Sequence, residues 1–329
     1  MTAPATLLAR AGAWGTALAL GRASPGGAHG LSILIFHRVL ATPDPLFPEE
    51  MDQAAFARRM QWLKASYKVL PLLDAVRLAR AGRLPARAAA ITFDDGYANN
   101  ATEALPVLRQ LGLCATFFVA TGFLDGGRMW NDSIIELVRR SPQPWLDASV
   151  VGLGGLPLTD LAARRRAIAL LLKVLKYLPL AQRGQAVQSL VHAARCALPD
   201  DLMMRSSQVK QLRHAGMEIG GHTVNHPILA ALDDLAARDE IVAGKQTLEN
   251  LLGSQVPLFA YPNGGPGTDF LARDVALVRA AGFEGAVTTS SGGGHCDLWQ
   301  LPRFTPWDRR EVRFNLRMAR NLLSSSTTV

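Results

Sequence analysis

The sequence predicts an α/β protein built on a parallel β barrel that carries a helical insertion. Three observations lead to this fold class. Short apolar runs alternate with helical stretches, which is typical of parallel strands joined by crossover helices. Six or more such runs are present and no GxGxxG follows the first, so a barrel is favoured over an open dinucleotide-binding sheet. Residues 128–205 break the alternation, because no strand pattern occurs there.

The apolar runs are expected to be buried strands, each bounded by turn residues or by the end of a helix. They cover residues 31–36, 88–93, 114–120, 217–222, 256–262 and 285–289. Helical patterns lie between them at residues 52–66, 102–112, 207–216, 233–253 and 272–282. Several of these patterns end at a Gly, the residue that favours the left-handed cap of a helix.

In the interrupted region, two amphipathic helices are predicted to meet near Pro179. We expect this insertion to lie beside the barrel mouth and to pack its apolar face on the body of the protein. Arg and Lys on the opposite face leave contact with a membrane surface as the alternative. Residues 1–30 are expected to form a flexible N-terminal segment, and residues 306–329 a helical C-terminal tail.

Composition limits the classes of function. The chain has 329 residues, 49% of them hydrophobic, and can bury a substantial core. Its charge of +8 is dispersed, which suits an anionic polymer or a membrane surface, and no zinc-finger or RNA-binding signature favours nucleic acid. Three widely spaced Cys argue against a disulfide framework. No clear signal peptide is present, so we expect the cytoplasm or the cytoplasmic face of the membrane, with export left open.

The stretch "ITFDDGY" places two carboxylates, Asp94 and Asp95, directly after a predicted strand. Adjacent residues of a strand point to opposite faces, so one carboxylate could bind a metal ion while the other stays free as a base. Asp-Gly is also a common turn dipeptide, and on this stretch alone an ordinary turn is the alternative.

A second motif, "GGHTVNHPIL", carries His222 and His226. Four residues apart on a helical turn, the two imidazoles would share one face and could bind one metal ion. Both motifs follow strands, and α/β barrels build their active sites at the carboxyl ends of strands. The two motifs together predict a divalent cation held by two His and one Asp.

The stretches "TFDDGY", "HTVNHP" and "FAYPNG", in this order, resemble the motifs of the polysaccharide deacetylase family, the NodB-homology group of carbohydrate esterases. The resemblance covers residues 31–305. It implies a distorted (β/α) barrel that removes acetyl groups from N-acetylated sugars with a bound divalent metal, most often Zn²⁺, with Co²⁺ or Ni²⁺ as alternatives. It also implies that Asp95, His222 and His226 are the metal ligands and that Asp94 is the catalytic base.

Other catalytic roles follow from the chemistry of amide hydrolysis. Because Pro262 fixes a turn and has no N–H, the backbone N–H of Asn263 is the candidate oxyanion donor. The family's third motif carries an Arg where this chain has Ala260, and Arg303 in "LPRF" is the candidate replacement, with a structural ion pair as the alternative.

The family's late His motif is not evident, so the general acid must come from elsewhere. His37, at the end of the first predicted strand, is the preferred candidate, and a structural His is its alternative. His295 lies in a Gly-rich loop and is the second candidate. Residues near the motifs are candidate substrate contacts, although packing or helix capping would explain several of them equally well: Tyr97, Trp130, Asn131, Asp132, Tyr261 and Pro262.

The sequence therefore predicts a metal-dependent deacetylase acting on an N-acetylhexosamine unit of a polysaccharide, glycolipid or lipid-linked saccharide. Two alternatives stay open. One is a glycan-binding relative that has lost catalysis, for which the missing Arg at Ala260 and the missing late His argue. The other is a metal-dependent hydrolase of a different amide or ester, since substrate choice depends on loop shape.

Overall fold

The computed structural model describes residues 20–22, 24, 26–27, 29–292, 297–305, 307–324 and 326–329. The chain forms two compact units. Unit 1 comprises Met1–Ala41, Met51–Leu124 and Met204–Val329, and unit 2 comprises Thr42–Glu50 and Asp125–Met203.

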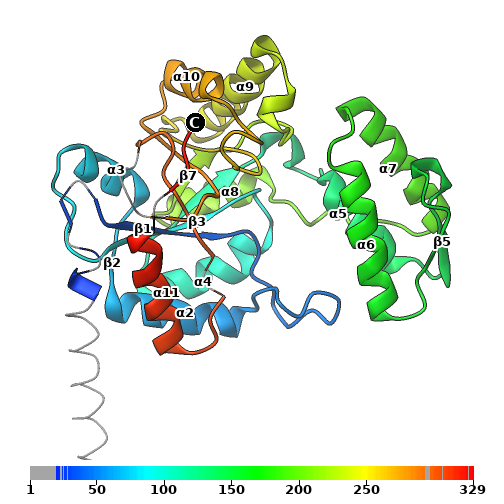
Figure 1. The fold of residues 1–329 in the computed structure, drawn as a ribbon, viewed down its shortest axis with the longest axis horizontal. Helices are drawn as coiled ribbons and strands as arrows, with labels where there is room; N and C mark the ends of the chain where they lie inside the picture. The colour runs from blue at the N-terminus through cyan, green and yellow to red at the C-terminus, as the bar shows by residue number, and fades with distance from the viewer. Residues whose placement is uncertain are drawn as a thin grey trace, which may run out of the picture. The chain divides into compact units, whose positions relative to one another are not determined.

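A parallel sheet is the centre of unit 1 (Figure 1). Among the described residues it has seven strands, in the order β1-β3-β4-β7-β8-β9, with β2 paired to the beginning of β3. The strands are β1 (Leu31–Phe36), β2 (Lys68–Val69), β3 (Ala88–Phe93), β4 (Thr116–Val119), β7 (Glu218–Gly221), β8 (Leu258–Ala260) and β9 (Gly285–Val287). Every residue of β3 is buried, which explains its continuous apolar sequence.

The two edges of the sheet are joined by the segment that contains Arg303. Leu301 forms a parallel bridge to Val287 in β9, and Phe304 forms one to Leu34 in β1. Backbone hydrogen bonds of 3.1 Å run from Phe304 N–H to Ile33 O and from Ile35 N–H to Phe304 O. The sheet thus curls into a distorted barrel, and the predicted fold class is confirmed.

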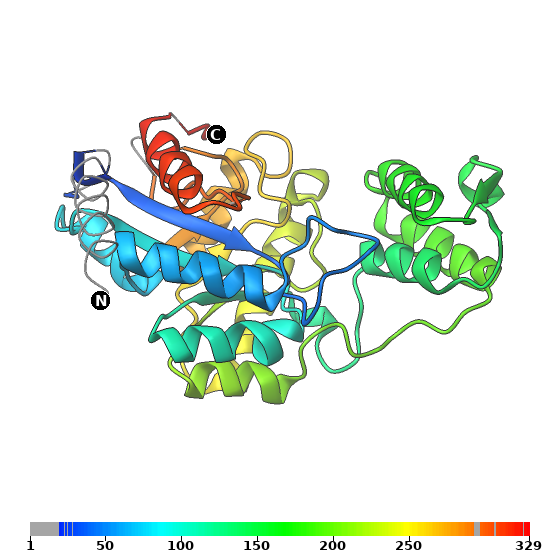
Figure 2. The same ribbon diagram turned by 90° about the horizontal axis from the view of Figure 1, so that it is seen from below.

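Helices of unit 1 follow the strands, as expected for crossover connections (Figure 2). They are α2 (Gln53–Ser66), α3 (Leu72–Arg80), α4 (Leu105–Leu111), α8 (Ser206–His214), α9 (Asp234–Leu252), α10 (Ala272–Ala280) and α11 (Glu311–Leu323), with the π-helical turn η1 (Asn100–Ala104) and the 3₁₀ turns η2 (Thr121–Phe123) and η4 (Leu229–Ala231). α11, from the predicted C-terminal tail, contacts β1 and α2 and buries Phe314 and Met318 in the main core.

Capping explains several helix boundaries. Asp52 caps α2 by accepting the Ala55 N–H, and Asp233 caps α9 by accepting the Ala236 N–H. The start of α3 follows Pro71, whose side chain cannot cap, and the carboxylate of Glu218 in β7 takes over this role. It accepts the Leu72 N–H at 2.7 Å, so a strand residue far along the chain closes the helix end.

Unit 2 is a small helical body with a core of its own. It contains α5 (Trp130–Arg140), the hairpin strands β5 (Trp145–Asp147) and β6 (Gly155–Pro157), the 3₁₀ turn η3 (Ser149–Val151), α6 (Leu161–Leu175) and α7 (Leu180–Ala194). α6 and α7 lie on the two sides of Pro179.

Two expectations about the insertion need correction. The region contains the short antiparallel pair β5–β6. Each strand has only three residues, too few to give a recognisable alternation in the sequence. The apolar faces of α6 and α7 pack against α5 and β5 inside unit 2, where Leu171 and Leu190 are fully buried. No helix in the described part of the chain is both long and apolar enough to cross a membrane.

Candidate metal and catalytic site

The adjacent carboxylates lie at the carboxyl end of β3. Asp94 N–H donates to the Phe36 carbonyl at 2.9 Å, which continues the β1–β3 ladder by one residue. Asp95 leaves the strand conformation, with a φ of 76°, and Gly96 follows with a φ of 90°. The left-handed backbone at Asp95 redirects the chain at the point where both carboxylates are presented, so it is this turn and not strand alternation that separates them.

His222 and His226 belong to the loop that follows β7. The loop is not helical, which corrects the expectation of a helical turn. Instead, Thr223 and His226 both have left-handed backbone angles, with φ values of 64° and 52°. This irregular loop brings the two imidazole rings to a centroid distance of 4.7 Å.

Asp95 completes a cluster with the two imidazoles. Its Oδ1 lies 3.4 Å from His222 Nε2 and 3.5 Å from His226 Nε2. Both separations exceed an ordinary N–H···O hydrogen bond. They match the spacing of roughly 3.3–3.5 Å between two ligand atoms bound to one tetrahedral Zn²⁺. Two imidazole nitrogens and one carboxylate oxygen are a donor set that fits a divalent cation with an open coordination position.

Two contacts orient the imidazoles. His222 Nδ1 donates to the Ala260 carbonyl at 2.7 Å, which leaves the lone pair of Nε2 directed toward Asp95. Thr223 Oγ1 accepts the His226 backbone N–H at 3.1 Å. Ala260, which stands where the family has an Arg, therefore orients His222 through its backbone carbonyl.

Glu240 of α9 holds the histidine loop from outside. Its Oε2 accepts the backbone N–H groups of Val224 and Asn225 at 2.9 and 2.8 Å, and its Oε1 accepts the Asn225 amide at 2.7 Å. One carboxylate thus satisfies three donors in the loop between the two His. No motif marked Glu240, since it is one acidic residue among several in a helix.

Asp94 is paired with Arg303 in the barrel interior. The guanidinium donates from Nη1 to Oδ1 and from Nη2 to Oδ2, both at 2.6 Å. It also donates to Thr92 Oγ1 at 3.1 Å and to the Thr288 carbonyl at 2.9 Å. Arg303 is fully buried and Asp94 is 2% exposed. The guanidinium and the carboxylate are therefore fixed by a two-pronged, charge-assisted contact.

The environment sets the charge states. Burial raises the pKa of Asp94, but the charge and hydrogen bonds of Arg303, together with the nearby imidazoles, hold that pKa below its usual range. Burial likewise raises the pKa of Asp95, but the contact with His222 and the charge of His226 bring it below the usual range. Burial lowers the pKa of His226 to about 4. For His222, burial lowers the pKa, but the contact with Asp95 and the charges of Asp94 and Asp95 together raise it above its usual value. Ionised carboxylates beside the neutral imidazole of His226 suit cation binding, and a bound cation would take the place of the proton that Asp95 favours on His222.

His37 and Asn263 lie at the edges of the site. His37 directly follows β1, so it is the strand neighbour of Asp94, and its side chain is exposed. Asn100 in η1 donates to the His37 carbonyl at 2.9 Å and so holds its backbone. Asn263 has a φ of 58°, and its carbonyl accepts the Thr289 hydroxyl at 2.7 Å.

Left-handed backbone is concentrated at this site. Seven described residues other than Gly have positive φ, and four of them are Asp95, Thr223, His226 and Asn263. Such conformations carry strain that the surrounding structure must support, and they are enriched at active sites.

Three candidate substrate contacts are largely removed from solvent. Tyr261 is fully buried, stacks on Phe270 with a centroid distance of 3.9 Å and donates its hydroxyl to the Trp299 carbonyl. Pro262 is also buried, and Tyr97 is 4% exposed beneath the guanidinium of Arg38. For Tyr261 in particular, the ring is taken up by core packing, which favours the packing alternative over a substrate contact.

The remaining candidates lie in unit 2 or outside the described residues. Trp130 begins α5 and lies under the Arg183 guanidinium, whose carbon is 4.8 Å from its ring centroid. The helix cap is Met129, so neither Asn131 nor Asp132 caps α5. Asp132 is 2% exposed within unit 2. His295 lies outside the described residues.

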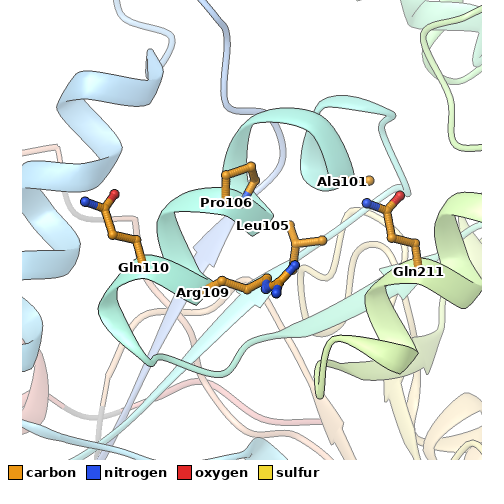
Figure 3. A pocket seen from close by; sticks show the side chains of 6 residues that line it. All are labelled: Ala101, Leu105, Pro106, Arg109, Gln110 and Gln211. Carbon is orange, nitrogen blue, oxygen red and sulfur yellow. The ribbon is translucent and has the colours of Figure 1, made fainter.

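A separate hollow of ≈ 430 Å³ lies on unit 1 between α4 and α8 (Figure 3). It is lined by Ala101, Leu105, Pro106, Arg109, Gln110 and Gln211. None of these residues belongs to the metal cluster or to the Asp94–Arg303 pair, so the hollow does not define the chemistry of the site.

Comparison with known proteins adds the family context. The family model described as polysaccharide deacetylase matches residues 81–142 and 183–285. The chain is 20% identical over 269 residues to YxkH of Bacillus subtilis (strain 168), which carries a polysaccharide deacetylase name; the match covers 81% of this chain and 67% of that protein.

Two solved structures have a similar fold. The deacetylase PplD of Streptococcus pyogenes, in complex with acetate, gives a TM-score of 0.59 at 18% identity, over 88% of this chain and 97% of that chain. IcaB from Ammonifex degensii gives 0.56 at 19% identity, over 87% and 97%.

Proposed function

Because the chain belongs to the polysaccharide deacetylase family, we propose that it hydrolyses the N-acetyl group of an N-acetylhexosamine unit with the help of a divalent cation. The proposed substrate is a polysaccharide, a glycolipid or a lipid-linked saccharide. The acetate in the PplD structure is the acid product expected of deacetylation and supports this reaction class.

The proposal rests on one observation: the two adjacent carboxylates, Asp94 and Asp95, have different partners. Asp95 lies with His222 and His226 in a donor set that fits a divalent cation, most simply Zn²⁺. Asp94 does not belong to this set and makes a paired contact with Arg303 instead. An ionised carboxylate beside a cation site, held in one orientation, is what a general base requires.

The cation, when held by Asp95, His222 and His226, would supply Lewis-acid polarisation and lower the pKa of water. In the proposed reaction, Asp94 accepts a proton from a water molecule while the oxygen of that water bonds to the acetyl carbonyl carbon. Arg303 keeps the carboxylate ionised before this step and holds it aligned while it takes the proton. The C–N bond then breaks, the amine nitrogen takes a proton, and acetate and the free amino sugar are released.

Two further roles complete the proposal. The backbone N–H of Asn263 has no acceptor among the described residues, so it is available as a donor to the oxyanion. His37 is exposed at the end of β1, one position from the ladder that carries Asp94, and is the proposed proton donor to the leaving amine. His295 is the alternative donor.

We also propose that the protein acts in the cytoplasm or at the cytoplasmic face of the membrane. Cys114 and Cys196 are free thiols, which suits a reducing compartment. Fractionation of cells with an antibody to the protein tests this location. Recovery in a periplasmic or culture fraction with a cleaved N-terminus would contradict it.

Acetate release tests the function. Metal-stripped protein is incubated with N-acetylglucosamine oligomers and with N-acetylated glycolipids, with and without Zn²⁺ or Co²⁺. We expect metal-dependent release in wild type and a loss of roughly 10²–10⁴-fold in Asp94→Asn, since this variant removes the base. Tight binding of one metal ion without release from any of these substrates would instead favour a non-catalytic relative or another substrate class.

A further inference from the structure

Unit 2 exposes an unusual amount of apolar surface. Of the thirteen large hydrophobic side chains exposed among the described residues, seven lie in unit 2, which holds only about a quarter of the chain. Three of them, Leu170, Val174 and Tyr177, are 43%, 37% and 74% exposed. Single exposed apolar side chains are ordinary, but a clustered set marks an interaction surface.

These three residues form one stripe. Their spacing of four and three residues puts them on the same side of α6 and of the turn that follows it. Lys176 continues the helical backbone angles, with φ −52° and ψ −43°, so the stripe runs on to Tyr177. The opposite side of α6 buries Ile168, Leu171 and Leu175 in the core of unit 2. The helix is therefore apolar on its buried side and again on its outer side.

Basic side chains accompany the stripe. Arg166 and Lys173 are exposed on the same side of the helix, and we define the α6 outer face as Arg166, Leu170, Lys173, Val174 and Tyr177. Within the described part of the chain, neither Arg166 nor Lys173 forms an ion pair with a carboxylate, and Arg166 meets only the longer-range charge of Asp160 at the N-cap of α6. The surrounding segment, residues 161–195, contains seven Lys and Arg and no Asp or Glu.

We infer that the α6 outer face binds the surface of an anionic lipid bilayer. Leucine, valine and tyrosine side chains would enter the boundary between headgroups and acyl chains, while Arg166 and Lys173 contact lipid phosphates. The α6 outer face would then be the surface through which the protein associates with the cytoplasmic face of the membrane. It concerns binding and does not require that the protein be a deacetylase.

Other partners fit this face less well. A nucleic acid or an acidic glycan would be complementary to the basic side chains, but it would leave the aliphatic side chains without apolar contacts. A second copy packed symmetrically on the same face would bring like charges together. A bilayer that contains anionic lipid offers apolar contacts to the stripe and phosphate groups to the basic residues.

An apolar stripe on α11 is the internal rival. Val312, Leu316 and Leu323 are 71%, 64% and 76% exposed. Their basic neighbours are partly neutralised, because Arg317 is paired with Asp308 and the helix begins at Glu311. On the α6 outer face neither Arg166 nor Lys173 forms such an ion pair within the described residues, although the charge of Asp160 at the N-cap reaches Arg166. We therefore assign the bilayer contact to the α6 outer face.

Sedimentation with sucrose-loaded vesicles tests the inference on the full chain. Vesicles of phosphatidylcholine alone are compared with vesicles that also contain phosphatidylglycerol, at low and high salt. We expect binding to the anionic vesicles that weakens with salt. Arg166→Gln with Lys173→Gln should lower the partition coefficient by roughly tenfold or more. Leu170→Gln with Val174→Gln should lower it by a similar factor on the same vesicles, because apolar insertion is lost.

Matched variants make the result decisive. Leu316→Gln removes an equally exposed apolar residue from α11, and Leu235→Gln does so from α9; both should bind vesicles like wild type. Circular dichroism confirms that each variant is folded, and acetate release from soluble oligomers should not change in the α6 variants. Binding that is insensitive to the α6 variants, or is lost with Leu316→Gln, overturns the assignment. So does the absence of vesicle binding, or a dimer in light scattering that the α6 variants abolish.

Discussion

Replacing Arg303 by Met should destabilise the protein strongly, although Met has a similar length and is apolar. The substitution leaves the Asp94 carboxylate, which is 2% exposed, without its two 2.6 Å contacts. Removing one partner of a buried ion pair costs about 3–5 kcal/mol, because an uncompensated charge remains inside the protein. For a chain of this size, that loss lowers the melting temperature by roughly 10 °C.

A double-mutant cycle isolates the pair. Asp94→Asn alone leaves the fully buried Arg303 facing a neutral amide. The free energy of unfolding is measured by urea denaturation for wild type, both single variants and Asp94→Asn combined with Arg303→Met. We expect the double variant to be more stable than the sum of the single effects predicts, by about 2 kcal/mol. Additive effects, or a cost of Arg303→Met near zero, would refute the argument that this contact organises the site.

Arg303→Lys separates charge from geometry. Lysine keeps the positive charge but cannot make the two-pronged contact with Asp94. We expect kcat to fall by roughly 10–100-fold with little change in KM, because the base is misaligned while the substrate surface is intact. An unchanged kcat would show that charge alone suffices, whereas an equal rise in KM would point to a role in substrate binding.

Three further outcomes concern residues that hold the site and the barrel. Glu240→Gln should weaken Zn²⁺ affinity by roughly 10–100-fold in a chelator competition, because the loop donors at Val224 and Asn225 lose their charged acceptor; unchanged affinity would contradict this support role. Glu218→Ala should cost about 1–2 kcal/mol in urea denaturation, since the Leu72 N–H loses its cap. Burial raises the pKa of Glu218, so the native state keeps its proton to higher pH than the unfolded state. Its contribution to stability is therefore present below the ordinary Glu pKa and is lost as pH rises through the raised value. Wild type should lose stability relative to Glu218→Gln as pH rises above the ordinary Glu pKa, as measured by urea midpoints.

The barrel could be predicted because each of its strands is a short apolar run flanked by turn residues. β3 is the clearest case, since all six of its residues are buried and apolar or Thr. The hairpin β5–β6 could not be predicted, because strands of three residues with alternating exposure carry too little periodic signal. The capping of α3 by Glu218 could not be predicted either, because Leu72 and Leu73 lie 146 and 145 positions away from Glu218 in the sequence.

The sequence by itself determined the chemical composition of the site. Asp94, Asp95, His222 and His226 stand in short motifs at the ends of apolar runs, and motif spacing encodes which residue types meet at one edge of a parallel sheet. Only the tertiary structure decided how they are arranged. Closure of the barrel through Leu301 and Phe304 brings Arg303 to Asp94 from 209 positions away. Such a contact depends on the register and curvature of the whole sheet, and neither property is written in any local stretch of the chain.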